Sequence, residues 1–255
     1  MRVEVLGCSG GIGGAGFLTT SLRVDEDILI DCGTGVGRLP LDDLKRIEHV
    51  FITHAHLDHI ALLPMLIDTV GDLRSAPIVL HATEETLSVL RAHIFNWSVW
   101  PDFTLIPGNG SPMLKMQAIR SGEPIILGER RITPIPALHT VPAVGYVMDA
   151  GGASLAFSGD TTVSDAQIAA LNGIADLRYL LVEAAFPEAH RDLAQAACHL
   201  SPGMLHEVLE RLTVSPEVFI THLKPGYAQE ISREINSFQG RFKLNVLHAG
   251  KCFEL

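Results

Sequence analysis

Paired cysteines, a positive charge balance and long apolar runs are all missing from this chain of 255 residues. Its four cysteines are scattered without a CxxC pair, which excludes a disulfide framework and favours buried, reduced thiols. The formal net charge of −10 argues against a surface built for nucleic acids. No apolar run is long enough to span a bilayer, and the opening MRVEVLG lacks a signal-peptide pattern. We therefore expect a cytoplasmic protein without a membrane partner.

The sequence consists mainly of short apolar runs separated by turn residues. Strand-like segments are frequent early in the chain and βα units follow later, which favours an α/β protein. The prolines and two tryptophans of residues 96–128 predict an irregular excursion. No low-complexity linker divides the chain, so we expect a single domain over residues 1–255. Helices are expected around residues 41–47, 62–70, 83–95, 165–172, 202–212 and 227–238.

The stretch FITHAHLDHI (51–60) concentrates ionisable side chains at the end of an apolar run. His54 and His56 project from the same face of an extended chain, and Asp58 and His59 follow in the turn into the next helix. Burying so many polar groups is costly unless they bind something, and a metal ion satisfies them best. This stretch therefore predicts metal ligands.

Two metal ions need more ligands than this stretch supplies, so the others must lie downstream. The letters FITH recur at residues 219–222, where His222 ends a strand-like run. His139 and Asp160 end two other runs, ITPIPALH and LAFSGD. The repeated FITH suggests two similar βα halves packed sheet on sheet, with both histidines meeting at one edge.

The combination of THAHLDH, His139, SGDT and THLK resembles the metallo-β-lactamase-fold hydrolases over essentially the whole chain. The resemblance implies an αββα sandwich of two similar halves. It also implies two divalent metal ions, zinc first, with manganese or iron as alternatives for imidazole and carboxylate ligands. The implied ligands are His54, His56 and His139 for the first ion, Asp58, His59 and His222 for the second, and Asp160 as the bridge.

Four further stretches, HLDHI, HIFNWSVWPDF, LLVEAAF and HLSPGMLHEVL, resemble class II cyclic-nucleotide phosphodiesterases. His199 precedes a helix start in which Ser201 is a good N-cap and Pro202 a good first residue. The resemblance places His199 at the scissile phosphate and pairs it with Glu183. Such a pair would favour the imidazolium, which can stabilise a phosphoryl oxygen or protonate the leaving alkoxide.

The implied reaction is hydrolysis of a small phosphodiester, a 3′,5′-cyclic nucleotide opening to the 5′-monophosphate. Two bridged metal ions would lower the pKa of a shared water molecule, and Asp58 would orient the hydroxide. Trp97 and Trp100 are candidates to stack the base, or they pack an irregular loop. Thr161 is a candidate phosphate contact or turn cap. Asp31 is expected to support a ligand histidine from behind.

Other reactions remain open on the same ligand set. A tRNA 3′-processing endonuclease would need a cationic surface, which the net charge of −10 disfavours. A thioesterase or lactamase would not need the His199–Glu183 pair, and a non-catalytic metal-stabilised protein is the third alternative. We expect a small phosphodiester as the partner molecule, and we leave a homodimer open.

Overall fold

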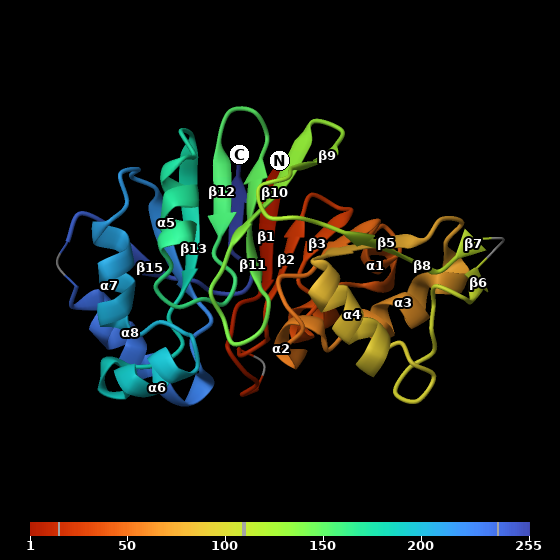
Figure 1. The fold of residues 1–255 in the computed structure, drawn as a ribbon, viewed down its shortest axis with the longest axis horizontal. Helices are drawn as coiled ribbons and strands as arrows, with labels where there is room; N and C mark the ends of the chain where they lie inside the picture. Colours follow the sequence, from red (N-terminus) through yellow and green to blue (C-terminus); the bar gives the residue numbers. More distant parts are fainter. Residues whose placement is uncertain (15, 109–110, 239) are drawn as a thin grey trace.

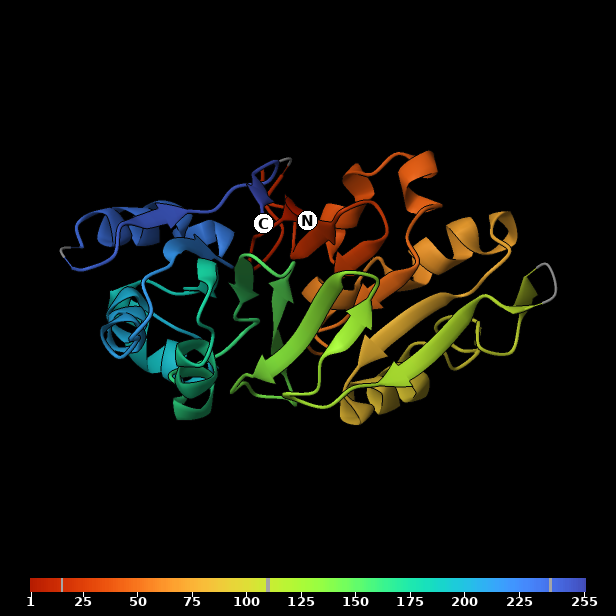
Figure 2. The same ribbon diagram turned by 90° about the horizontal axis from the view of Figure 1, so that it is seen from above.

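In the described part of the chain, two seven-stranded sheets pack face to face between two layers of helices (Figure 1). The computed structural model describes residues 1–14, 16–108, 111–238 and 240–255. Figure 2 shows the helices of the two halves on opposite outer sides of the sheets. The αββα sandwich expected from the sequence is confirmed.

Each half of the chain supplies most of one sheet. Sheet 1 has the order β16 (Cys252–Glu254), β1 (Arg2–Gly7), β2 (Ser21–Val24), β3 (Ile28–Ile30), β4 (His49–Phe51), β5 (Ile78–Ala82) and β8 (Leu114–Ala118). Sheet 2 has the order β15 (Leu244–Val246), β14 (Glu217–Thr221), β13 (Leu177–Glu183), β12 (Ser154–Phe157), β11 (Val144–Asp149), β10 (Arg130–Pro136) and β9 (Ile125–Leu127). A separate two-stranded ribbon pairs β6 (Pro107–Gly108) with β7 (Ser111–Pro112).

The helices cover the outer faces of the two sheets (Figure 1). Sheet 1 carries α1 (Leu41–Leu44), α2 (Leu57–Ile60), α3 (Leu63–Val70) and α4 (Glu84–His93). Sheet 2 carries α5 (Asp165–Asn172), α6 (Arg191–Ala196), α7 (Pro202–Glu210) and α8 (Ala228–Asn236). Thr83 caps α4 by accepting a hydrogen bond from the Thr86 N–H, as its position predicts. No helix among the described residues is long and apolar enough to cross a bilayer.

The residues of the repeated Phe-Ile-Thr sequence have equivalent positions in the two sheets. Phe51 and Phe219 are both buried in the core between the sheets. Ile52 and Ile220, the next residues, are buried under the outer helices of sheet 1 and sheet 2. Successive side chains of an extended chain point to opposite faces, so the shared pattern gives both segments the same orientation. The histidine that ends each segment therefore emerges at an equivalent position.

The segment 96–128 corrects the prediction of an irregular excursion. Its strand β8 pairs with β5 in parallel, with Leu114 opposite Ile78, and completes the edge of sheet 1. Its strand β9 pairs with β10 in sheet 2. Pro107 and Pro112 lie within the two-residue strands β6 and β7, and Pro124 lies between β8 and β9, so the prolines keep these strands short without preventing them. The short helix α6 and the strand β16 also lie outside the sequence prediction.

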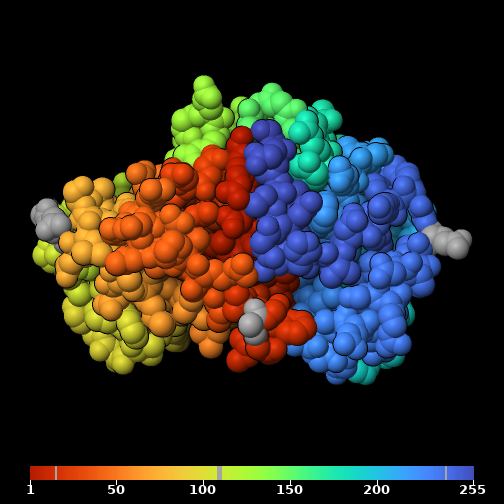
Figure 3. Space-filling view, turned by 180° about the vertical axis from the view of Figure 1, so that it is seen from behind, coloured from red at the N-terminus to blue at the C-terminus, as the bar shows by residue number. Residues whose placement is uncertain are grey.

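The first and last strands lie side by side. β1 pairs with β16 in the antiparallel sense, and the Leu255 N–H donates to the Met1 carbonyl at 2.9 Å. Figure 3 shows the N-terminal and C-terminal segments in contact along the back of the molecule. The chain thus returns from sheet 2 to complete sheet 1, which ties the two halves together.

Candidate functional site

The two FITH segments bring their histidines to the same edge of the sandwich. The N–H of His222 donates to the Cys8 carbonyl at 2.8 Å, and the backbone of His222 is left-handed, with φ 61°. Gly10 approaches so closely that a Cβ there would lie 2.5 Å from the His222 carbonyl oxygen. A left-handed histidine is uncommon and persists only where its surroundings hold it, which is typical of functional sites.

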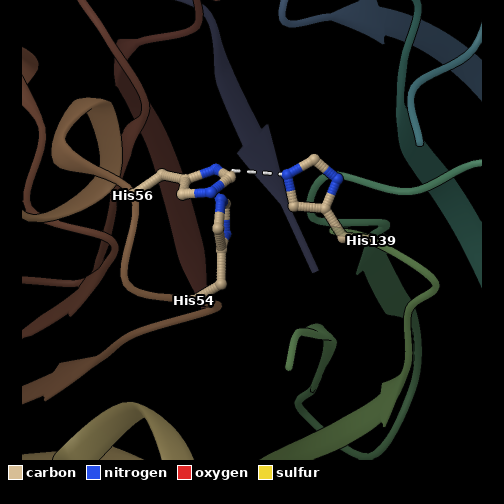
Figure 4. Close-up of side chains that lie close together, drawn as sticks. All are labelled: His54, His56 and His139. Carbon is tan, nitrogen blue, oxygen red and sulfur yellow. Dashed lines mark hydrogen bonds between the residues drawn. The ribbon is translucent and has the colours of Figure 1, made fainter. Parts of the chain in front are cut away.

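One group of nitrogen ligands consists of His54, His56 and His139. One ring nitrogen from each lies within 4.8 Å of the others. His56 Nδ1 and His139 Nε2 are 3.2 Å apart, and Figure 4 shows the three rings converging from two separate segments. His139 comes from the connection between β10 and β11, whereas the other two follow β4. Three imidazoles that share one point form a metal-ligand group.

A second group consists of Asp58, His59, Asp160 and His222, whose ligand atoms also lie within 4.8 Å of one another. Asp160 Oδ2 is 3.3 Å from Nε2 of His59 and 3.3 Å from Nε2 of His222. The same oxygen lies 3.7 Å from Nε2 of His54, which belongs to the first group. Asp160 therefore stands between the two groups, where one carboxylate can serve two cations.

Several buried atoms of these groups have no hydrogen-bond partner among the described residues. They are His54 Nε2, His59 Nε2, Asp160 Oδ1 and His222 Nδ1. Leaving such atoms unpaired in the interior costs free energy, and the first three are atoms that can coordinate a divalent cation. The donor set thus fits a pair of divalent cations.

The burial of two of these histidines, His54 and His222, also suits metal binding. Burial lowers the pKa of His54 well below its usual value, which keeps the imidazole neutral. Burial likewise lowers the pKa of His222, to about 4. A neutral imidazole is the form that binds a metal ion. Both side chains are therefore available as ligands at neutral pH.

Two supporting contacts fix the orientation of ligand histidines. His59 Nδ1 lies 2.6 Å from Asp31 Oδ2, and the Thr53 hydroxyl and N–H also donate to the buried Asp31 carboxylate. His139 Nδ1 lies 3.0 Å from the Cys198 carbonyl oxygen. A proton on Nδ1 in each ring leaves Nε2 directed at the cluster. Asp31 thus lies where the sequence placed it, behind a ligand histidine.

His199 and Glu183 are adjacent, with His199 Nδ1 2.7 Å from Glu183 Oε1. The His199 ring lies 4.9 Å from the His139 ring and 5.3 Å from the His222 ring. Burial favours the neutral imidazole, but the charge and hydrogen bond of Glu183, assisted by Asp160, raise the pKa of His199 overall. The geometry therefore places a paired histidine directly against the metal-ligand groups.

Ser201 occupies the N-cap position of α7 but does not cap it with its own hydroxyl. That hydroxyl donates instead to Glu188 Oε2 at 2.6 Å, and the same oxygen accepts from the Gly203 N–H at 2.7 Å. A carboxylate at the first turn of a helix is favourable because it satisfies a free N–H and opposes the helix dipole. The local sequence predicted where the helix begins, whereas the carboxylate that caps it comes from Glu188.

The tryptophans do not meet the ligand groups. Trp100 packs against the core under the helices of sheet 1, and Trp97 is 63% exposed. Their loop follows α4, which lies between it and α2 in Figure 1. Among the described residues, no ring contact or hydrogen bond joins either indole to the histidines. The structure therefore gives no support to the stacking role expected for these side chains.

Thr161 is buried, and its hydroxyl is engaged within the protein. The hydroxyl donates to the Thr162 carbonyl at 2.9 Å and accepts from the Leu138 N–H at 3.0 Å. Its own N–H donates to Glu183 Oε1 at 2.8 Å. Thr161 thus holds Glu183 and the segment before His139 in place, and the alternative of a phosphate contact loses support.

The ligand groups, the paired histidine and the αββα sandwich together define a metallo-hydrolase of the β-lactamase fold. The chain matches the family model described as Beta-lactamase superfamily domain over residues 26–223. The chain belongs to this family, and it is a metallo-β-lactamase-fold hydrolase with candidate ligands for divalent metal ions.

Curated proteins of other organisms are similar in sequence to this chain. A Yersinia pestis protein described as "Probable 3′,5′-cyclic-nucleotide phosphodiesterase" is 28% identical over 210 residues, covering 72% of this chain and 59% of that protein. This chain thus spans less than two thirds of that relative. An uncharacterized protein of Mycobacterium tuberculosis is 29% identical over 266 residues, covering 100% of this chain and 91% of that protein.

A solved structure shares the fold over its whole length. The structure of unliganded yeast PDE1 superposes with a TM-score of 0.81 at 19% identity, covering 100% of this chain and 99% of that chain. At this identity the likeness shows the fold alone.

Proposed function

We propose that the protein is a dinuclear metal-dependent phosphodiesterase that hydrolyses a small phosphodiester, in the first instance a 3′,5′-cyclic nucleotide to its 5′-monophosphate. The observation that carries this proposal is the His199–Glu183 pair, 2.7 Å apart and packed against the ligand histidines. A protonated histidine at this place can stabilise a phosphoryl oxygen or protonate the leaving alkoxide of a phosphodiester. The similarity to the Yersinia pestis protein supports the same substrate class.

The proposed ligands are His54, His56 and His139 for one ion and Asp58, His59 and His222 for the other, with Asp160 shared. Two divalent cations held there, zinc first, would supply Lewis-acid polarisation of the phosphate and a hydroxide nucleophile near neutral pH. Asp58 has the most exposed side chain of the second group, at 29%, so it can orient a nucleophile from the solvent side.

His199 acts as the general acid in this scheme. Glu183 accepts from the N–H of Thr161 at 2.8 Å and of Leu200 at 3.2 Å, so its carboxylate is fixed on both sides of the histidine contact. The carboxylate keeps Nδ1 protonated and favours the imidazolium, whose Nε2 proton goes to the leaving alkoxide. The raised pKa of His199 extends the imidazolium to higher pH than an ordinary histidine would keep it.

The test compares substrates on one metal-analysed preparation. Hydrolysis of bis(p-nitrophenyl) phosphate and of cyclic AMP or cyclic GMP is expected, with little turnover of a thioester, a lactam or a tRNA precursor. Turnover of bis(p-nitrophenyl) phosphate without opening of any cyclic nucleotide would support the phosphodiesterase reaction and contradict cyclic nucleotides as its substrate. Efficient cleavage of the thioester or lactam alone would overturn the reaction class.

A further inference from the structure

Lys224 is a cation at the site that the ligand and acid assignments leave without a role. It follows the ligand His222 by two residues, and its N–H donates to the Ala185 carbonyl at 3.4 Å. Its ammonium lies 5.2 Å from the centre of the Phe186 ring, and that ring lies 5.8 Å from the His199 ring. Phe186 therefore contacts both the lysine and the proposed acid.

The charge of Lys224 has no carboxylate partner within ion-pair distance among the described residues. Lys45, by comparison, meets Asp42 at 2.6 Å. Lys224 is half-buried, so its charge is less screened than that of a fully exposed lysine.

Phe186 thus holds a half-buried cation, without an ion-pair partner in the described part of the chain, near the proposed acid, where an anion could contact both. We propose that Lys224 binds a non-bridging oxygen of the substrate's phosphodiester group, beside the alkoxide that His199 protonates. Lysine suits this role because its ammonium is a compact charge that binds phosphate without a fixed geometry. The inference rests on the proposed function, and it adds a residue that binds the substrate anion through the protein rather than through the cations.

Lys224 holds the anion both before and during the reaction, so its removal weakens binding more than it slows the chemical step. Lys224→Met retains an apolar stem against Phe186 and deletes only the charge. Lys224→Gln is a second neutral variant, and Lys224→Arg restores the charge. Lys251→Met is the matched control, since the Lys251 ammonium also lies over aromatic rings, 5.4 Å from those of Phe219 and Phe253.

The experiment measures the dissociation constant of inorganic phosphate by calorimetry on metal-loaded proteins of equal metal content. Loss of one charge-assisted contact should weaken phosphate binding about tenfold in Lys224→Met and Lys224→Gln. Lys224→Arg and Lys251→Met should bind phosphate within about twofold of the parent protein, the range of small surface effects. KM for bis(p-nitrophenyl) phosphate should rise by a similar factor in the two neutral variants, with kcat nearly unchanged.

Equal phosphate affinity in Lys224→Met, Lys224→Gln and Lys251→Met would overturn the proposal. Phosphate binding does not require turnover, so the outcome is separate from that of the proposed function. A parent protein that binds phosphate through Lys224 but hydrolyses no diester would support the lysine site and reject the phosphodiesterase.

Discussion

The two halves of the sandwich contribute to the site in different ways. The first half delivers His54, His56, Asp58 and His59 from one continuous stretch that follows β4. The second half delivers its groups singly, each from the end of a different element, and adds the His199–Glu183 pair. The first half thus holds its candidate ligands in one compact segment, whereas the second half completes the candidate ligand groups and holds the proposed acid. Metal binding and proton transfer should therefore be separable by mutation.

The largest effect is expected at Asp160, which joins the contributions of the two halves. Asp160→Ala should lose most of one metal ion and reduce diesterase activity by more than about 10²-fold, because both groups lose their shared carboxylate. Elemental analysis and kinetics on the same sample check this. Asp165→Ala, which removes a surface carboxylate paired with Arg211 at 2.7 Å, is the control and should alter neither. Full metal content in Asp160→Ala would reject the bridging role.

The next effect separates the acid from the metal ligands. His199→Ala should keep its metal content and lose at least about 10²-fold in kcat, the size typical of removing a general acid. An unchanged rate on diesters would return His199 to an ordinary packing role.

The pair also predicts a pH effect with a definite sign. Glu183 raises the pKa of His199, so the imidazolium survives to higher pH than it would alone. Glu183→Gln removes the negative charge and lowers that pKa, so the alkaline limb of the kcat profile should move to lower pH. A limb that stays in place would show that another group controls it.

A smaller effect is expected at Asp31, behind the first half's ligands. Asp31→Asn should weaken metal affinity by about 10- to 100-fold, as removal of a histidine-orienting carboxylate does. Asp27→Asn is the control, because Asp27 pairs with Arg130 across the two sheets and not with a ligand. It should lower the melting temperature and leave metal affinity unchanged. Equal metal affinity in the two variants would contradict the role of Asp31.

The smallest effect is expected at Trp97, whose loop lies beyond α4. Trp97→Ala should leave KM for the diester substrate unchanged, since the indole is largely exposed and makes no contact with the ligand groups among the described residues. A several-fold rise in KM would restore the loop to the substrate site.

The sequence predicted the sandwich and brought the ligand candidates forward because both depend on local patterns. Apolar runs that end in histidine or aspartate mark strand ends, and strand ends of two packed sheets meet at one edge. The capping of α7 by Glu188 could not be predicted, because it depends on a chain segment 13 residues away from Ser201. Strand β8 was not predicted because its local sequence has no clear strand pattern, and its pairing with β5 is what makes it a strand. Lys224 belongs to the THLK stretch, but its place beside Phe186 could not be predicted, since only folding brings its ammonium to that ring.

Cys198 shows how a backbone direction can constrain the chain length around a site. Its φ of 53° ends α6 and turns its carbonyl toward His139 Nδ1. The contact is made by the peptide group, so glycine or asparagine should serve at this position, whereas valine resists a left-handed backbone. One residue inserted into α6 would rotate everything after it by about 100°, since the helix has 3.6 residues per turn. The length of α6 therefore determines whether the Cys198 carbonyl reaches His139. Substitutions in this helix should be tolerated far better than insertions or deletions.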